Sequence, residues 1–205
     1  MPRYVLYTSQ EDHSADCERF PLAAIPRLVM LDTNVVECLV RYSHCIFEQQ
    51  PAPIELDETR RRDIEALMHV FLVSSRAYWS WDFCVSPITL EELERTNNRE
   101  LRSELLEYGI TFPSAGDNGG ISPELAAAGD DLARRVVDSS LFAALPDRED
   151  RMILAHAVAY GCDALCTRDR RTIVQKRDRL PKLPLRIMTP EEWWSHIKPW
   201  AGLWC

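Results

Sequence analysis

A short apolar run that ends at an aspartate constrains this chain more than any other feature. Residues Leu28 to Leu31 are apolar between polar flanks, which indicates a buried strand of a parallel sheet. Asp32 falls at the carboxyl end of that strand, and Thr33 and Asn34 can cap a following helix. Ligands of open α/β sheets bind at this end of the strands. The stretch therefore predicts a site built around a carboxylate or, more simply, an aspartate that only begins a helix.

Further strand-like runs alternate with helical patterns along the chain. They begin near residues 83, 164 and 185, and the longest helical pattern runs from Asp57 to about Tyr78. Strands that alternate with helices are typical of parallel sheets. The sequence therefore predicts an α/β fold, a three-layer α/β/α sandwich with a mostly parallel sheet of four or five strands, and a helical arm in addition.

The length of the chain predicts a single domain with additions at both ends. A chain of 205 residues is long enough for folding to bury roughly 70% of its surface. We expect the domain at residues 27–200, followed by a tail at 201–205. Residues 1–26 form an N-terminal extension, which is polar and irregular after a strand at Tyr4 to Tyr7.

An excursion from this domain is expected at about residues 97–147. Its centre is the sequence GITFPSAGDNGGISP, whose glycines and prolines predict a loop. A helix with Ser122 as its cap follows and runs, with an interruption at Gly129, to about Leu145.

Charge and cysteine content argue against several classes of protein. The net charge of −8 disfavours a protein that coats nucleic acid nonspecifically, because such binding depends on Lys and Arg. Seven cysteines without an export signal favour buried thiols, and Cys162 and Cys166 lack the partner pair of a zinc site. No apolar stretch approaches the roughly 20 residues that cross a bilayer. We therefore expect a cytoplasmic protein that makes no contact with a membrane.

One segment is nevertheless rich in positive charge, and we call it the basic segment. Its cationic residues are Arg168, Arg170, Arg171, Lys176, Arg177, Arg179 and Lys182. Such a concentration can bind phosphates, or it can simply be the solvated face of a helix.

Four acidic residues lie where carboxylates can meet. Asp32 ends one predicted strand, Glu92 lies on the helix after the second, Asp150 is in the first turn of a helix, and Asp169 lies two residues past another strand. Two charges about 4 Å apart interact at roughly 4 kcal/mol with an effective dielectric of 20, so such a group either takes up protons or binds a cation. Oxygen ligands alone favour Mg²⁺ or Mn²⁺.

Each of these residues also has a simpler interpretation. Asp147-x-x-Asp150 resembles a helix capping arrangement in which Asp150 meets the free N–H groups at the start of the helix, and Asp169 can be a turn residue. Glu92 or its neighbour Glu91 can pair with Arg95 one turn further on. The conjunction of four such positions at one sheet edge favours a metal site over the four separate interpretations.

These residues fall within blocks that resemble the PIN-domain nucleases, which include the toxin ribonucleases of bacterial toxin–antitoxin pairs. The blocks occur in the family's order and cover under half of the chain. They are LDTN at 31–34, SPITLEEL at 86–93, DRMILAHA at 150–157 with GCDALCTRD at 161–169, and RIMTPEEW at 186–193.

The resemblance implies an endoribonuclease in which divalent metal ions activate a water that attacks an RNA phosphodiester. Asp32, Glu92, Asp150 and Asp169 would be the catalytic and metal-binding quartet, with Glu92 preferred over Glu91 because it keeps the form T-x-x-E-L. The supporting residues would be Thr33, Asn34 and Thr167. The RNA-binding residues would be Arg168, Arg170, Arg171, Lys176 and Arg177, and they would contact single-stranded or looped RNA.

Partners and two other functions stay open on the sequence. An antitoxin-like protein and a homodimer are both compatible with the resemblance, but the long helix, the excursion and the N-terminal extension depart from the compact toxins. A non-catalytic PIN-like module that binds RNA or scaffolds a complex is the first alternative. An aspartate-based phosphohydrolase is the second, although such enzymes usually carry another acid two positions after the nucleophile, where this chain has Asn34.

Overall fold

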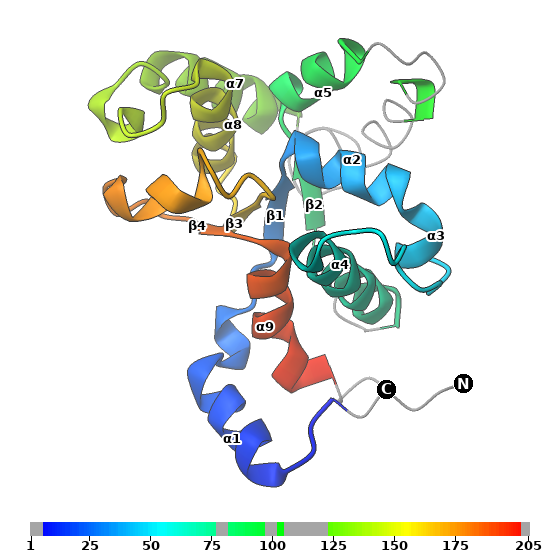
Figure 1. Ribbon diagram of the computed structural model, residues 1–205. Helices are drawn as coiled ribbons and strands as arrows, with labels where there is room; N and C mark the ends of the chain where they lie inside the picture. Colours follow the sequence, from blue (N-terminus) through cyan, green and yellow to red (C-terminus); the bar gives the residue numbers. More distant parts are fainter. Residues whose placement is uncertain (1–5, 77–81, 97–101, 105–122, 202–205) are drawn as a thin grey trace.

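The structure is a computed structural model that describes residues 6–76, 82–96, 102–104 and 123–201. Within these residues four strands form one sheet in which every pairing is parallel, and helices flank both faces (Figure 1). The strand order is β2-β1-β3-β4. The strands are β1 (Leu28–Leu31), β2 (Asp82–Val85), β3 (Ala164–Cys166) and β4 (Arg186–Met188). The predicted α/β fold, with its parallel sheet and its four strand positions, is therefore confirmed.

Helices occupy the connections between the strands, as the alternation of patterns predicts, and further helices precede the first strand and follow the last. The α-helices are α1 (Gln10–Arg19), α2 (Thr33–Arg41), α3 (Ser43–Ile46), α4 (Glu58–Arg76), α5 (Pro87–Glu94), α7 (Pro123–Val136), α8 (Arg148–Ala159) and α9 (Pro190–Ala201). The 3-10 helices are η1 (Leu22–Ala24), η2 (Ser140–Phe142) and η3 (Val174–Arg179). None of these described helices has the length and apolar character needed to cross a membrane.

Two hydrophobic cores lie on opposite faces of the sheet. Successive residues of a strand point to opposite faces, so Val29 and Leu31 join α2, α3, α4 and α9 in one core, whereas Met30 joins α7 and α8 in the other. The central strand β1 is thus covered on both sides, which explains its uninterrupted apolar sequence. Both cores end near the carboxyl ends of the strands, where the polar site begins.

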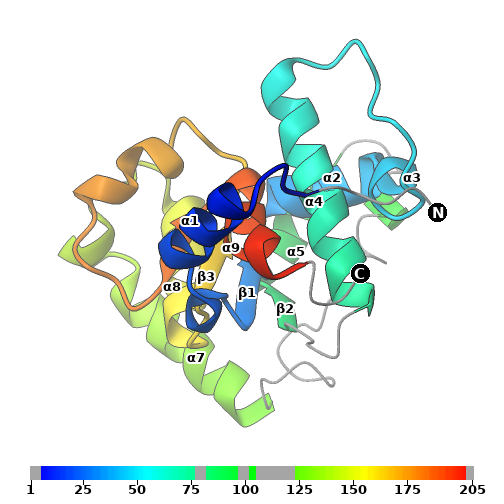
Figure 2. The same ribbon diagram turned by 90° about the horizontal axis from the view of Figure 1, so that it is seen from below.

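The N-terminal extension differs from the expected irregular segment, because residues 10–19 form α1. Ser9 caps this helix by accepting a hydrogen bond from the Asp12 N–H at 3.0 Å. Figure 2 shows α1 beside α9, and the Trp200 Nε1–H donates to the Phe20 carbonyl at 2.7 Å. The polar composition of residues 10–19 therefore reflects a helix on the surface and not an irregular segment. Of the strand predicted at residues 4–7, residues 4 and 5 lie outside the described residues, and residues 6 and 7 belong to no strand.

The excursion contains a second difference, at Gly129. The helix α7 continues through this residue without the predicted interruption. A Cβ atom added at Gly129 would lie 2.5 Å from the Tyr160 ring, so the glycine serves a close approach of α7 to α8. The predicted loop, up to residue 122, lies outside the described residues. Of the part of the excursion between residues 97 and 122, the structure describes residues 102–104, which are helical.

Candidate metal-binding active site

Asp32 lies at the junction of β1 and α2 and is held by three different groups. Its Oδ1 accepts the Thr33 N–H at 2.8 Å, and its Oδ2 accepts hydrogen bonds from Asn34 Nδ2 at 2.7 Å and Thr167 Oγ1 at 2.5 Å. The side chain does cap α2, as the simpler interpretation predicts. It is also 4% exposed and tied to the loop after β3, which helix capping alone does not require.

Glu92 faces Asp32 across the strand ends, and Glu91 does not. The helix α5 begins with Ser86 as its cap and Pro87 at its first position, and it turns the half-buried Glu92 toward α2. The Thr33 hydroxyl donates a hydrogen bond to Glu92 Oε2. Glu91 is exposed and forms an ion pair with Arg95 at 3.7 Å, the role considered for both glutamates. The contact that distinguishes Glu92 from Glu91 is the hydrogen bond from Thr33, which joins two segments far apart in the sequence.

Asp150 is not the cap of its helix. Asp147 fills that position, where its Oδ1 accepts the Glu149 N–H at 2.9 Å. Asp150 instead lies beside the Thr172 hydroxyl, and burial raises the pKa of the carboxyl while the hydrogen bond from Thr172 opposes that increase in part. That hydroxyl also donates to Asp169 Oδ2, so one threonine lies between two members of the predicted quartet.

Asp169 combines a turn role with a position at the site. Its Oδ1 accepts the N–H groups of Arg171 at 2.9 Å and Thr172 at 2.8 Å, which closes the turn that follows β3. Its own N–H donates to Thr167 Oγ1 at 3.0 Å. Thr167 therefore links Asp169 to Asp32, since its hydroxyl also donates to Asp32.

The charges of the quartet act on one another. Burial raises the pKa of Glu92 to about 7, and the Asp32 carboxylate adds to the increase. Burial raises the pKa of Asp150 to about 6, with further increases from the charges of Asp32 and Asp169. Burial also raises the pKa of Asp32, and its hydrogen bonds oppose that change in part while Asp169 adds to it. The fold thus gathers four carboxylates at one end of the sheet with a surplus of negative charge.

The donor atoms of this group suit a hard cation, although they are not arranged as a finished coordination shell. Four carboxylates and the neighbouring hydroxyl and amide groups supply oxygen, which is the ligand type of Mg²⁺ and Mn²⁺. Among the described residues, however, no three His, Cys, Asp or Glu side chains stand together as ligands that could hold a metal ion.

Much of the basic segment is neutralised by carboxylates of the fold. Arg168 and Arg170 form ion pairs at 3.4 and 2.8 Å with Asp63, a residue of α4 that is 2% exposed. Arg177 pairs with Glu192 through two contacts of 2.7 Å. These three arginines hold loops and helices in place. The segment's remaining cations, Arg171, Lys176, Arg179 and Lys182, form no ion pair with any described residue.

Asp63 should be important for stability and for the geometry of the site. Arg168 donates its N–H to Asn34 Oδ1 at 2.7 Å, so the Asp63 pair orders the loop that also carries Asp169. Replacing Asp63 with asparagine leaves two partly buried arginines without a counter-ion, and we expect a loss of about 2–3 kcal/mol in the free energy of unfolding. Urea denaturation measures this change. The exposed Glu65 of the same helix provides the control, since Glu65→Gln should change stability by less than about 0.5 kcal/mol.

Three residues near the site were not predicted. Thr172 could have been found from its position three residues after Asp169, which is typical of a capped turn. Asp63 lies one turn before the buried Leu67 on α4, so an acidic residue on an apolar face was the available signal. Glu149 shares a hydrogen bond with Glu92, which raises the pKa of Glu92, and it pairs with Arg95 at 2.5 Å.

A chain of Ser86, His156 and Asp130 has the residue types of a hydrolase triad but not its accessibility. Ser86 Oγ lies 2.8 Å from His156 Nδ1, and His156 Nε2 lies 3.6 Å from Asp130 Oδ1. The Ser86 side chain is fully buried and accepts the Ile88 N–H as the cap of α5. Because no substrate can reach that oxygen, we interpret this chain as a polar connection between α5, α7 and α8.

Comparisons of this chain with protein-family models, with curated proteins and with solved structures found no match. The fold and the placement of the four carboxylates therefore define an α/β protein with an acidic group at the carboxyl ends of its strands.

Proposed function

We propose that this protein is a divalent-metal-dependent endoribonuclease that hydrolyses RNA phosphodiester bonds. The observation that supports it best is the gathering of Asp32, Glu92, Asp150 and Asp169 at a single end of the sheet. There burial and the charge of Asp32 raise the pKa of Glu92 and of Asp150, and the charge of Asp169 adds to the increase for Asp32 and Asp150. Ionising several buried carboxylates close together costs free energy, and a bound cation offsets that cost. Substrate and chemistry come from the resemblance to PIN-domain nucleases.

The four carboxylates would hold Mg²⁺ or Mn²⁺, and the bound ion would supply a nucleophile by lowering the pKa of a water molecule. The other residues of the site orient Asp32 and Asp169. Thr33, Asn34 and Thr167 donate to the Asp32 carboxylate. Thr172 does the same for Asp169. Fixed ligands of this kind reduce the reorganisation that cation binding requires.

RNA contacts would come from the cations that the fold does not neutralise. Arg171 and Lys176 follow Asp169 closely in the chain and form no ion pair with the described residues, so they are better candidates for phosphate contacts than Arg168, Arg170 or Arg177. Unpaired RNA is the expected substrate. A protein partner such as an antitoxin would be expected to cover the same negative site with a positive group.

The direct experiment is incubation of the full chain with a mixed pool of RNA in Mg²⁺, in Mn²⁺ or in EDTA. We expect cleavage with either ion and none in EDTA. Gel electrophoresis of the products measures the cleavage. A pool of double-stranded DNA of equal length serves as the control substrate. RNA that stays intact in both metal ions would contradict the proposal.

The non-catalytic RNA-binding or scaffold module is the second candidate, and two observations favour it. The described carboxylates do not stand together as ligands for a metal ion, and three arginines of the basic segment serve the fold. A titration with Mn²⁺ followed by calorimetry separates the two candidates, because a scaffold has no need to bind the ion.

A further inference from the structure

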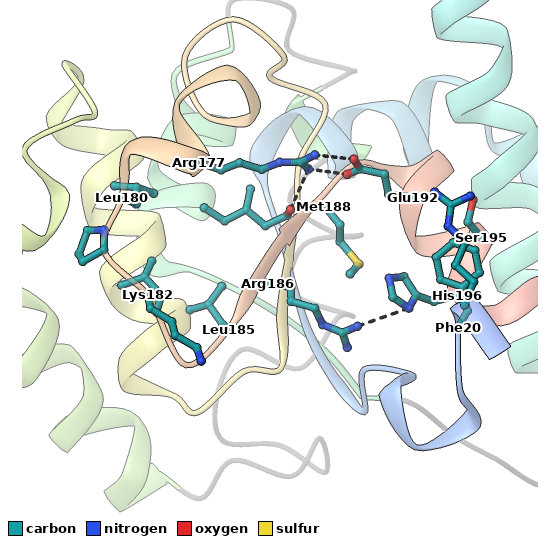
Figure 3. Close-up of a pocket in the computed structure, with 14 residues that line it drawn as sticks. Phe20, Arg177, Leu180, Lys182, Leu185, Arg186, Met188, Glu192, Ser195 and His196 are labelled. Atoms are coloured by element: carbon teal, nitrogen blue, oxygen red, sulfur yellow. Dashed lines mark hydrogen bonds and ion pairs between the residues drawn. The ribbon is translucent and has the colours of Figure 1, made fainter. Parts of the chain in front are cut away.

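A pocket of about 530 Å³ lies along the outer edge of the sheet, beside β4 (Figure 3). Its walls come from β4, from the segment 180–185 that precedes it, from α9 and from the end of α1. Pockets for small molecules typically have volumes of roughly 300–1,000 Å³. The proposed nuclease site does not use this pocket, since none of the four carboxylates lines it.

Positive charge dominates the described residues that line the pocket. Four cations, Arg19, Arg177, Lys182 and Arg186, face one carboxylate, Glu192. Arg177 already pairs with Glu192, as the dashed lines in Figure 3 show. The other three cations form no ion pair with a described residue. In a chain with a net charge of −8, this local surplus favours an anionic ligand.

Arg186 is the cation with the most to gain from an anion. Its Nη2 donates to the Ala24 carbonyl at 2.6 Å, and its Nη1 lies 3.4 Å from His196 Nδ1. Burial lowers the pKa of Arg186, and the charge of Asp163 opposes that effect without forming an ion pair. A guanidinium that is fixed by neutral partners and lacks a carboxylate is prepared for two-point contact with a phosphate.

The rest of the pocket offers aromatic and apolar surface next to this cation. The rings of Phe20 and His196 meet edge to face with centroids 4.8 Å apart, and Figure 3 shows Arg186 directed toward His196. Leu185 and Met188 add apolar side chains to the lining. Bases of single-stranded nucleic acid stack on aromatic side chains while cations contact the backbone.

An extended peptide fits the pocket less well, because the edge of β4 is already occupied. A peptide that adds to a sheet needs the outward N–H and C=O groups of the edge strand. The Ile187 carbonyl accepts Arg177 Nη1 at 3.1 Å, and the Thr189 N–H donates to Glu192 Oε2 at 2.9 Å. The Arg177–Glu192 pair thus closes the positions that an added strand would use.

We propose that this pocket binds a nucleotide, with its phosphate at Arg186 and its base against Phe20, His196 and the apolar wall. The nucleotide is either free or one unit of an RNA strand, and the two share the same recognition chemistry. This inference goes beyond the proposed nuclease activity, because it requires neither a metal ion nor the four carboxylates.

The test is a calorimetric titration of the full chain in EDTA with adenosine 5′-monophosphate, with adenosine and with inorganic phosphate. We expect the monophosphate to bind at least about tenfold more tightly than either fragment. Arg186→Gln should weaken its binding by about tenfold or more, because a charged hydrogen-bonding partner is lost. Arg19→Ala should weaken it to a smaller extent. The control Arg179→Ala removes the same charge from η3, outside the pocket, and should have no effect.

Several results would overturn the inference. They are no binding of the monophosphate at millimolar concentration, equal binding of adenosine or phosphate, or unchanged binding in Arg186→Gln and Arg19→Ala. If Arg186→Gln fails to fold by circular dichroism, Arg19→Ala and Lys182→Ala decide the question at exposed positions. Binding of an acidic peptide with no binding of the monophosphate would also refute it.

Two further experiments are needed. One distinguishes a free nucleotide from a unit of an RNA strand, and the other distinguishes failure of the pocket proposal from failure of the nuclease proposal. A six-nucleotide RNA that competes with the monophosphate in EDTA would show that the pocket accepts a unit of a strand, and absence of competition would restrict it to the free nucleotide. Asp32→Asn should bind the monophosphate as the wild type does. A protein that binds the monophosphate but cleaves no RNA would contradict the nuclease proposal alone.

Discussion

Asp32→Asn is expected to reduce metal-dependent cleavage of RNA by on the order of a thousandfold, the upper range for removing one electrostatic group from an active site. Asp32 is the member of the quartet whose charge acts on both Glu92 and Asp150. Asparagine keeps the shape and can still accept the Thr33 N–H, but it removes the charge that attracts a cation. Affinity for RNA should stay the same or rise, because a negative charge has left the surface that phosphates approach.

Single-turnover cleavage of a labelled RNA and calorimetric titration with Mn²⁺ measure the two effects. Asp82→Asn is the matched control, since Asp82 is an exposed aspartate at the amino end of β2, the opposite end of the sheet. It should cleave and bind the ion as the wild type does. Wild-type cleavage by Asp32→Asn would remove the basis of the nuclease proposal and leave the scaffold module as the better account.

The second large effect is a loss of stability as the pH rises in the absence of metal ions. The pKa of Glu92 is about 7 and that of Asp150 about 6, against ordinary values of 4.5 and 3.8. The folded protein therefore holds more protons than the unfolded chain between these values, and stability falls as the pH rises through this window. With allowance for partial exposure, each group contributes on the order of 2 kcal/mol to the free energy of unfolding at low pH, and this contribution is lost at high pH.

In EDTA we therefore expect the melting temperature to decrease by about 10 °C between pH 4.5 and pH 8, given that about 1 kcal/mol corresponds to 2–4 °C at this chain length. Mn²⁺ should restore most of the loss at pH 8 and have little effect at pH 4.5, where Glu92 and Asp150 are protonated. Differential scanning calorimetry at several pH values measures both effects.

Buried histidines act in the opposite direction and need a control. Burial lowers the pKa of His156 below the ordinary 6.5, so its contribution to stability is lost as the pH falls. Comparing the wild type with Glu92→Gln cancels this background, because both proteins contain the same histidines. The melting temperature of Glu92→Gln should depend less steeply on pH than that of the wild type. Glu91→Gln, the exposed neighbour, should keep the wild-type dependence. Identical pH profiles for the wild type and Glu92→Gln would show that Glu92 does not titrate in this range.

The general layout of the fold could be predicted because it depends on local pattern. A continuous apolar run of four residues has the length and burial of a parallel strand, and helical periodicity between such runs requires crossover connections. The interruption expected at Gly129 was wrong, because the intrinsic preference of glycine is overridden there by the close approach of Tyr160. Likewise, the low hydrophobicity of residues 10–19 concealed a helix that needs only a shallow contact with α9.

The site residues also differ in whether local pattern or tertiary packing determines their position. The sequence by itself determined that Asp32 and Asp169 follow strands of one parallel sheet, since chain direction places their carboxylates at one end of it. Only the tertiary structure decided that Glu92 and not Glu91 faces Asp32, that Asp150 lies beside Thr172, and which cations the fold neutralises. Arg170 pairs with a carboxylate 107 positions earlier in the chain. Such pairings depend on how helices pack across the sheet, and periodicity within one segment contains no information about the partner that another segment supplies.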